Sequence, residues 1–436
     1  MKRRVLSLLL VICMVAGLLT FTVGAEEAKV AAIRLSKSYG KNSAGDDVSF
    51  PETLTATEGG EPVYAITDQE TGLTTRAGAN AENYNVKFEY PAGGIPTIYL
   101  KNAKIENNCG YGLTPEYVKG LFDMKIVVES DSSVKASMGC LYTKGGDFTI
   151  TGPGKLTLET YQVHSALAVL KTNDTDRYNL YLKDITLEVN FDGVSGSLIS
   201  TELGDINIEN STITGLNKNG SGIVANNGDL TATNSTFDFS ASWYGFAAMK
   251  GNISLTNCTI KAISGFKVLY ADEDALIKNC DAFLEGDHFE NVAIDIWGDF
   301  IIDNSTVEMY ALDMPIFAED TIPIFVGYYR AIAGKDQEST AKYKEEFYNV
   351  YQYMKVVPAD TPEESTEETY EDETEETTDE STGATQTPSN APTQTPAGTD
   401  VASDNSTILW IVAAVVLLGV FATAAIIIIK KSKAAE

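Results

Sequence analysis

The feature that most constrains this chain is an asparagine that returns every 22 to 25 residues between positions 210 and 304. In four of the five copies a glycine stands six residues before the asparagine, and an apolar residue follows it three residues later. The repeated positions are Asn210, Asn234, Asn257, Asn279 and Asn304. A fixed period in this range is typical of a solenoid, in which each repeat supplies one coil.

Each copy also alternates between apolar and polar residues, which is the pattern of a half-buried strand and not of a helix. The apolar positions lie four and two residues before the asparagine and three residues after it, for example Ile206, Ile208 and Ile213. Strands that recur once per coil stack in parallel, about 4.8 Å apart. Weaker copies carry the frame upstream to Asn102. We therefore predict an all-β, parallel β-helix of about nine coils.

The repeated asparagine has a structural interpretation. An asparagine at the bend between two strands tolerates the left-handed conformation, and its amide forms hydrogen bonds with the coils above and below. Several copies also match the Asn-X-Ser/Thr pattern for N-glycosylation. Because the residue recurs once per coil, we favour a ladder of stacked asparagines.

The two ends of the chain carry targeting patterns. Residues 1–25 combine a basic start, an apolar stretch and a small-residue cleavage pattern, which together predict a signal peptide. Residues 407–429 contain no charge and are long enough to cross a hydrocarbon core of about 30 Å. Three lysines lie in the tail 430–436, which places that tail in the cytoplasm. We expect a single-pass protein of the cell membrane with an extracellular ectodomain.

Residues 359–406 are rich in Thr, Glu, Ser and Pro and hold 14 acidic residues but no Lys or Arg. Such a segment cannot bury enough apolar surface to fold, so we predict a disordered acidic stalk. The ends of a β-helix expose unpaired strand edges and need caps. We expect the β-helix to span residues 85–318, with an N-terminal cap at 26–84 and a C-terminal cap at 319–358.

Composition narrows the class of ligand. The chain carries a net charge of −29, and residues 26–358 alone carry −20. No excess of basic residues is available to neutralise phosphates, so we expect no nucleic-acid partner. Only two histidines occur, His164 and His288, which disfavours a histidine-rich metal site.

A resemblance follows from these motifs. The asparagine repeat resembles right-handed parallel β-helices of the pectate-lyase-like superfamily. Two segments, Thr97–Ile105 and Gly146–Leu158, resemble more narrowly the clostridial-type surface proteins whose β-helix binds carbohydrate. The resemblance covers about residues 85–350 and implies calcium-dependent binding of polysaccharide. It transfers no individual ligand residue to this chain.

A column of acidic residues stands five residues before the asparagines: Asp205, Asp229, Asp274 and Asp299, continued by Asp147 and interrupted by Asn179 and Asn252. Carboxylates stacked at the strand spacing repel one another, and Ca²⁺ with its preference for oxygen ligands relieves that repulsion. Each aspartate alternatively caps its own turn through backbone N–H groups. Both interpretations are open at the level of sequence.

An aromatic group recurs nine residues after successive asparagines: Trp243 with Tyr244, Phe266, and His288 with Phe289. If the turns keep register, these rings lie on one face, where flat rings bury the faces of sugars. The alternative is that they point inward and belong to the core.

Two of the five cysteines, Cys258 and Cys280, follow ladder asparagines and lie one coil apart. They serve either as small apolar filler or as a disulfide, for which direct stacking is a strained geometry. Whether Cys109 and Cys140 are neighbours is open.

Catalysis finds little support. A β-helix lyase needs acidic metal ligands and a strong base, and between residues 85 and 358 the only arginines are Arg177 and Arg330. Hydrolysis needs two facing carboxylates. A chain this acidic always offers such a pair, so this requirement does not distinguish a hydrolase from a binding protein. We expect non-catalytic binding of a plant or cell-wall polysaccharide, with Ca²⁺ as the candidate cofactor. A polysaccharide lyase or hydrolase and a protein-binding adhesin are the alternatives.

Overall fold

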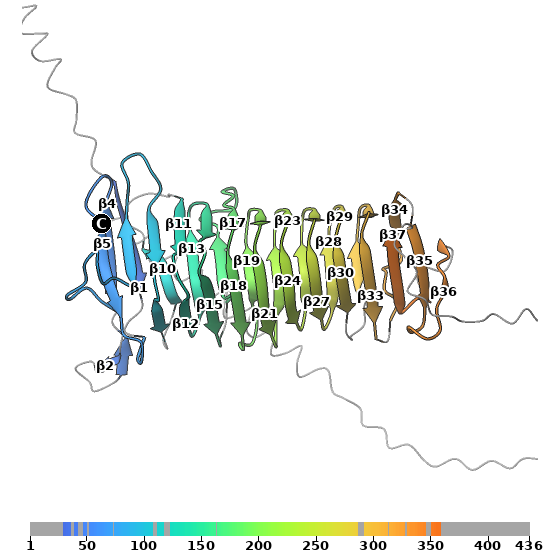
Figure 1. Cartoon of the computed structure of the whole chain (residues 1–436), viewed down its shortest axis with the longest axis horizontal. Coiled ribbons are helices and arrows are strands. Elements are labelled where there is room, and N and C mark those ends of the chain that lie inside the picture. The colour runs from blue at the N-terminus through green and yellow to red at the C-terminus, as the bar shows by residue number, and fades with distance from the viewer. Residues whose placement is uncertain are drawn as a thin grey trace, which may run out of the picture. The chain divides into compact units, whose positions relative to one another are not determined.

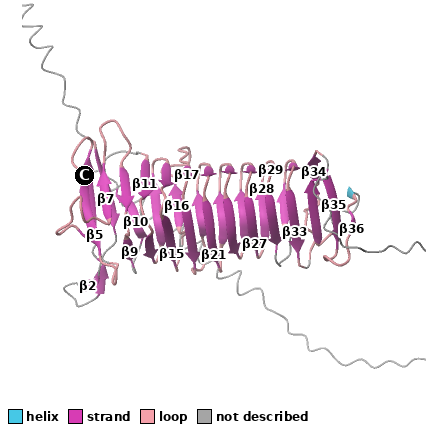
Figure 2. Ribbon diagram, in the orientation of Figure 1, coloured by secondary structure: helices cyan, strands magenta, loops and turns pink. Residues whose placement is uncertain are grey.

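The computed structural model describes residues 29–358, except for 36–38, 42–46, 50–51, 73, 108–110, 117–122, 163, 287–291, 313, 328 and 346–349. These residues form strands and turns, with one short 3₁₀ turn near the C-terminal end (Figure 2), and contain no α-helix. Three long sheets run side by side along a stack of coils (Figure 1), and a short hairpin of β2 (Tyr39–Lys41) and β3 (Asp47–Ser49) lies apart from them.

Sheet 1 contains, in chain order, β1 (Val30–Leu35), β4 (Glu52–Thr57), β10 (Tyr111–Glu116), β13 (Gly139–Lys144), β16 (Leu167–Leu170), β19 (Ser197–Thr201), β22 (Ser221–Ala225), β25 (Tyr244–Ala248), β28 (Lys267–Ala271) and β31 (Ile294–Ile296).

Sheet 2 contains, in the same order, β5 (Val63–Thr67), β6 (Thr74–Thr75), β7 (Val86–Glu89), β8 (Thr97–Leu100), β11 (Met124–Val128), β14 (Phe148–Thr151), β17 (Leu180–Lys183), β20 (Ile206–Glu209), β23 (Leu230–Thr233), β26 (Ile253–Thr256), β29 (Ala275–Lys278), β32 (Phe300–Asp303) and β34 (Pro323–Val326).

Sheet 3 contains β9 (Lys104–Asn107), β12 (Ser132–Ala136), β15 (Lys155–Thr160), β18 (Thr186–Phe191), β21 (Thr212–Asn217), β24 (Thr236–Ala241), β27 (Thr259–Ser264), β30 (Asp281–Gly286), β33 (Thr306–Ala311), β35 (Tyr329–Gly334), β36 (Ala341–Lys342) and β37 (Tyr353–Pro358).

One coil consists of a strand from sheet 2, a strand from sheet 3 and a strand from sheet 1, as in β20, β21 and β22. Each strand pairs in parallel with its counterpart one coil away, so that Ile206 lies beside Leu230 and Ile213 beside Phe237. The described residues therefore form a parallel β-helix of about nine coils, which confirms the solenoid predicted from the repeat.

The core fills the space between the three sheets. The apolar positions predicted to face inward are all buried: Ile206, Ile208, Ile213, Leu230, Ala232, Phe237, Ile253, Leu255, Ile260, Phe300, Ile302 and Val307. Phe246 sits among them from sheet 1, and its ring contacts those of Phe237 and Phe239 edge-on at 5.2 and 5.0 Å. The alternation seen in the sequence is confirmed by this burial.

Antiparallel strands cover both ends of the stack. At the N-terminal end, β1 pairs antiparallel with β10 and β4, and β7 pairs antiparallel with β8 and β5. At the C-terminal end, β37 pairs antiparallel with β33 and β35. At the N-terminal end these strands pair the edges of sheets 1 and 2, and at the C-terminal end they pair the edge of sheet 3.

The predicted signal peptide, acidic stalk, membrane span and cytoplasmic tail lie outside the described residues. Within the described residues no helix is long and apolar enough to span a membrane.

Candidate functional site

The corner between sheets 2 and 3 carries the asparagine column. Every repeated asparagine adopts a left-handed backbone there, with φ between 46° and 53°. The amide Nδ2 of Asn234 donates to Oδ1 of Asn210 at 3.2 Å, and that of Asn257 donates to Oδ1 of Asn234 at 3.0 Å. The pattern continues through Asn279 and Asn304 at 3.1 and 2.8 Å. These side chains form a hydrogen-bonded ladder along the stack.

A second column follows one residue later, and its members are Ser211, Ser235, Cys258, Cys280 and Ser305. Each is buried, and each hydroxyl or thiol donates to a carbonyl two residues before it, at 2.7 to 3.3 Å. Cys280 Sγ also accepts the backbone N–H of Cys258 at 3.3 Å. Both cysteines are free thiols that occupy serine positions, and Cys109 lies outside the described residues.

The acidic column lies at the turn from sheet 1 to sheet 2. Oδ1 of Asp205 accepts the backbone N–H of Asp229 at 3.0 Å, and Oδ1 of Asp274 accepts that of Asp299 at 2.9 Å. Oδ1 of Asp229 accepts the N–H of Asn252 at 2.8 Å in the same way. Asp205, Asp229 and Asp274 therefore each cap the turn of the next coil through one oxygen. Within the described residues no three acidic, histidine or cysteine side chains converge on a point that suits a metal ion.

A glycine precedes Asp205, Asp229 and Asp299, and two of these glycines have a clear steric reason. A Cβ at Gly228 would lie 2.3 Å from the carbonyl oxygen of Gly204, and one at Gly204 would lie 2.0 Å from that of Tyr178. Both distances are far below van der Waals contact. The backbone of one coil therefore approaches the next too closely for any side chain at these positions.

The predicted aromatic group gathers on the outer face of sheet 1. The Phe266 ring lies 6.4 Å from that of Trp243 and 5.4 Å from that of Tyr244, measured between centroids. Trp243 is 57 % exposed, while Tyr244 and Phe266 are half-buried. The turns therefore keep register and bring these three rings together. His288 lies outside the described residues.

Tyr270 enlarges this aromatic cluster, although the sequence spacing gives no sign of it. Its ring lies 5.5 Å from that of Tyr244, and its hydroxyl donates to Asp272 Oδ1 at 2.6 Å. Burial, followed by that hydrogen bond, raises the pKa of Tyr270 above its ordinary value. The hydroxyl therefore stays a proton donor at neutral pH.

Beneath the rings, Lys267 forms an ion pair with Asp295 on the neighbouring strand. The ammonium group of Lys267 lies 4.8 Å from the Tyr270 ring centroid and 5.4 Å from that of Phe266. Both partners of the ion pair are mostly buried. The cluster thus combines flat apolar rings with charged groups that are held in place, which is a chemistry suited to polar ligands with flat faces.

Trp297 is the other functional candidate that the spacing misses. It is 72 % exposed and directly follows β31, at the opposite end of the sheet 1 strands from Trp243. From the strand register, the two indoles lie about 20 Å apart along the strands and about 10 Å apart across them. The sequence signal that could have found it is that Trp243 and Trp297 are the two tryptophans of residues 26–358, while the third, Trp410, falls in the predicted membrane span.

A second aromatic group lies on the same sheet toward the N-terminal end. The rings of Tyr111 and Tyr142 are 4.3 Å apart, and His164 lies 5.8 Å from Tyr111. Burial raises the pKa of Tyr142 to about 12. His164 has a φ of 88°, which is rare for a residue with a side chain. Beside this group lies a pocket of about 280 Å³, whose lining includes Glu202.

A line of small side chains joins the two aromatic groups. In register from Tyr142 to Tyr270 the outer face carries Ala168, Ser200, Val224 and Ala247. Five strand spacings separate the two tyrosines, which is about 24 Å. All four of these side chains are buried, whereas Tyr142 and Tyr270 at the two ends are partly exposed.

Comparison with known proteins finds no similar protein for this chain. No protein-family model matches the chain, and neither curated proteins nor solved structures show a significant similarity to it.

Proposed function

We propose that this protein binds a polysaccharide, without catalysis, along the outer face of sheet 1. The observation that carries the proposal is the pair of exposed tryptophans, Trp243 and Trp297, on opposite rims of one sheet. Exposed aromatic side chains that gather on one face are typical of a surface that binds a ligand or partner.

The chemistry of the face suits a sugar chain. Flat rings bury the apolar faces of pyranose rings, while the Tyr270 hydroxyl and the Lys267–Asp295 pair supply hydrogen bonds for hydroxyl groups. Tyr270 and Tyr142 lie five strands apart in register, so a polymer that contacts both aromatic groups runs along the stack. The substrate class is therefore a linear polysaccharide long enough to span about 24 Å.

The setting of the protein belongs to the same proposal. A signal peptide, an acidic stalk and a membrane span would display the β-helix at the cell surface. The asparagine repeat supports a right-handed β-helix related to the pectate-lyase-like superfamily and to clostridial-type surface carbohydrate-binding proteins.

Calcium at the acidic column stays a prediction. One oxygen of Asp205, Asp229 and Asp274 is used by a backbone N–H of the next coil. A cation would bind at this column through the remaining carboxylate oxygens.

The test is native electrophoresis of the full chain, in mild detergent, through gels that contain one polysaccharide each. We expect retardation by one class of glycan, and a loss of apparent affinity of about tenfold in Trp243→Ala and in Trp297→Ala. Tyr329→Ala is the matched control, because Tyr329 is an exposed ring outside sheet 1. The same gels run with calcium and with chelator decide the calcium prediction.

Retardation that persists in both tryptophan variants would contradict the assignment of this face. Retardation by no glycan would leave a protein-binding adhesin as the better interpretation. Release of shortened or unsaturated sugar products would instead indicate a lyase or hydrolase.

A further inference from the structure

The ion pair of Lys267 and Asp295 on sheet 1 differs from the other ion pairs of this chain. Its two side chains keep only 11 % and 15 % of their surface exposed. The next most buried pair between described residues, Lys87 with Glu89, keeps 19 % and 23 %. Two opposite charges that leave water lose their hydration, and their mutual attraction offsets this loss only when further hydrogen bonds complete the site.

No such further hydrogen bonds surround the Lys267–Asp295 pair. An ammonium group carries three donors, and a carboxylate has two acceptor oxygens. Within the part of the chain that the structure describes, the two side chains form no hydrogen bond except the one to each other. Rings lie against the ammonium instead, with the centroid of Tyr270 at 4.8 Å and that of Phe266 at 5.4 Å. The pair therefore leaves most of its hydrogen-bonding capacity unused next to apolar rings.

The backbone holds the two side chains in contact. Lys267 is the first residue of β28, and Asp295 lies on β31, where it pairs in register with Tyr270 of β28. Ile294 and Ile296, on either side of Asp295, are buried in the core and fix its position on the sheet. Reactive groups that a rigid scaffold keeps in contact behave as if at effective concentrations of about 10⁵–10⁸ M in well-oriented cases.

We propose that Lys267 and Asp295 condense to an amide, which joins β28 to β31 through a covalent bond between side chains. Apolar surroundings disfavour both charges, so the ammonium gives a proton to the carboxylate and leaves a neutral amine beside a carboxylic acid. The lone pair of Lys267 Nζ attacks Cγ of Asp295, and a bond from Cγ to nitrogen replaces the bond from Cγ to the hydroxyl oxygen. The departing hydroxyl takes one proton from the nitrogen and leaves as water. The step needs no oxidant, reductant or further reactant.

The amide suits this site better than the ion pair. It carries no charge, and it has one N–H donor and one carbonyl acceptor, so fewer polar groups lie without partners against the rings. The bond would connect two residues that are 28 positions apart in the sequence. Like a disulfide, it would constrain the unfolded chain, but reducing agents would not break it.

A second lysine–aspartate pair provides an internal comparison. Lys278 and Asp303 also face each other on neighbouring parallel strands, with 2.7 Å between Nζ and Oδ2. The Lys278 side chain is 45 % exposed, so water stabilises its charged form, which is not a nucleophile. We therefore expect this pair to remain an ion pair, and burial to distinguish the two sites.

The experiment is peptide mapping by mass spectrometry of the full chain, which is denatured, reduced and digested with trypsin. We expect peptides 262–278 and 279–330 as one joined species, lighter than their sum by one water molecule and uncut after Lys267. Lys267→Arg should abolish the joined species, because a guanidinium stays charged and does not attack a carboxyl group at neutral pH. Asp295→Ala should abolish it as well, and fragmentation of the joined species locates the bond.

Separate peptides that are cut after Lys267 would overturn the proposal. A loss of water that persists in Lys267→Arg would overturn it too, because the dehydration would then lie elsewhere in the chain. An amide between Lys278 and Asp303 but not at Lys267 would contradict the role given to burial. Because the readout is a mass, none of these outcomes depends on glycan binding by sheet 1.

Discussion

At the corner between sheets 2 and 3, the coils turn through one left-handed residue and one small residue, and the flanking strands begin and end at the same offsets. At the two rims of sheet 1 the turns vary. The turn into sheet 1 has three residues at 218–220 and two at 242–243, and the turn out has four at 226–229 and three at 272–274. The ladder corner repeats the exposed asparagine ladder and the buried serine and cysteine column in successive coils. The rims instead hold Trp243 and Trp297, which do not repeat.

This difference teaches where the chain is free to vary. At the ladder corner each side chain is both donor and acceptor for its neighbours, so a change in one coil disturbs two others. At the rims Trp243 and Trp297 face water, and a change at either residue leaves the stack intact. Structure and ligand recognition are thus assigned to different edges of the same coil.

The largest expected effect is at the ladder. Asn257→Val places a β-branched side chain at a φ of 53° and removes two ladder hydrogen bonds. We expect a loss of about 3 kcal/mol in the free energy of unfolding, measured by denaturant titration. Asn257→Asp is the control, because Asp184 occupies the same ladder position at a φ of 52°. If both variants lost equal stability, the backbone argument for the ladder would fail.

The next effect separates binding from stability. The double variant Trp243→Ala with Trp297→Ala should lose glycan affinity by more than about tenfold, while its free energy of unfolding changes by less than about 0.5 kcal/mol. Electrophoresis in glycan gels and denaturant titration on one preparation check both parts. A large loss of stability would show that the rims are structural like the ladder, and would erase the contrast between them.

Alkaline pH should weaken the fold through the sheet 1 tyrosines. Burial raises the pKa of Tyr142 to about 12, above the value near 10 of an exposed tyrosine. The unfolded chain then releases this proton at lower pH than the folded chain, so the stabilising contribution is complete below about pH 10 and is lost as the pH rises through about 12. Denaturant midpoints across this window, compared with those of Tyr142→Phe, measure the contribution. An unchanged pH profile in the variant would assign the loss to other groups.

The smallest effect concerns the cysteine column. Cys280→Ser should change the free energy of unfolding by less than about 1 kcal/mol, because serine already serves at Ser235 and Ser305. Cys280→Val should cost about 1–3 kcal/mol, since it leaves the buried Cys258 N–H without its partner. Serine and valine variants of equal stability would show that the column is filler and not a second ladder.

Most of the fold follows from the sequence because each coil repeats the same local rules. Alternation assigns Ile206 and Ile208 to the core, and the recurring asparagine marks the left-handed corner. The spacing also places the acidic column correctly at one member per coil, although its backbone partners depend on how closely adjacent coils approach.

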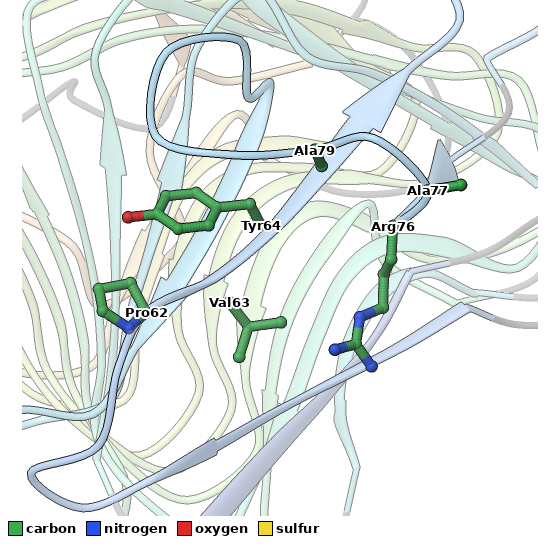
Figure 3. A pocket seen from close by; sticks show the side chains of 6 residues that line it. All are labelled: Pro62, Val63, Tyr64, Arg76, Ala77 and Ala79. Atoms are coloured by element: carbon green, nitrogen blue, oxygen red, sulfur yellow. The ribbon is translucent and has the colours of Figure 1, made fainter.

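The candidate site is only partly predictable. Trp243, Tyr244 and Phe266 follow their asparagines at a constant offset and meet in space as that offset implies. Tyr270 and Trp297 lie toward the other end of the sheet 1 strands, at positions where no aromatic residue repeats from coil to coil. The spacing in the sequence therefore does not predict them. A pocket in the N-terminal cap (Figure 3) lies against antiparallel strands that occur once, so no repeat in the sequence predicts it either.

The ladders also bear on how a gene for such a protein can change in length. Residues 234–256 form one whole coil, and their removal would bring Asn257 directly onto Asn210 with every column continued. Insertions or deletions of a whole coil therefore preserve the fold and lengthen or shorten the sheet 1 face in steps of about 4.8 Å. At the ladder corner, a change of any other length shifts the columns out of line. Recombination between repeats is thus a route by which such a chain fits its binding face to ligands of different length.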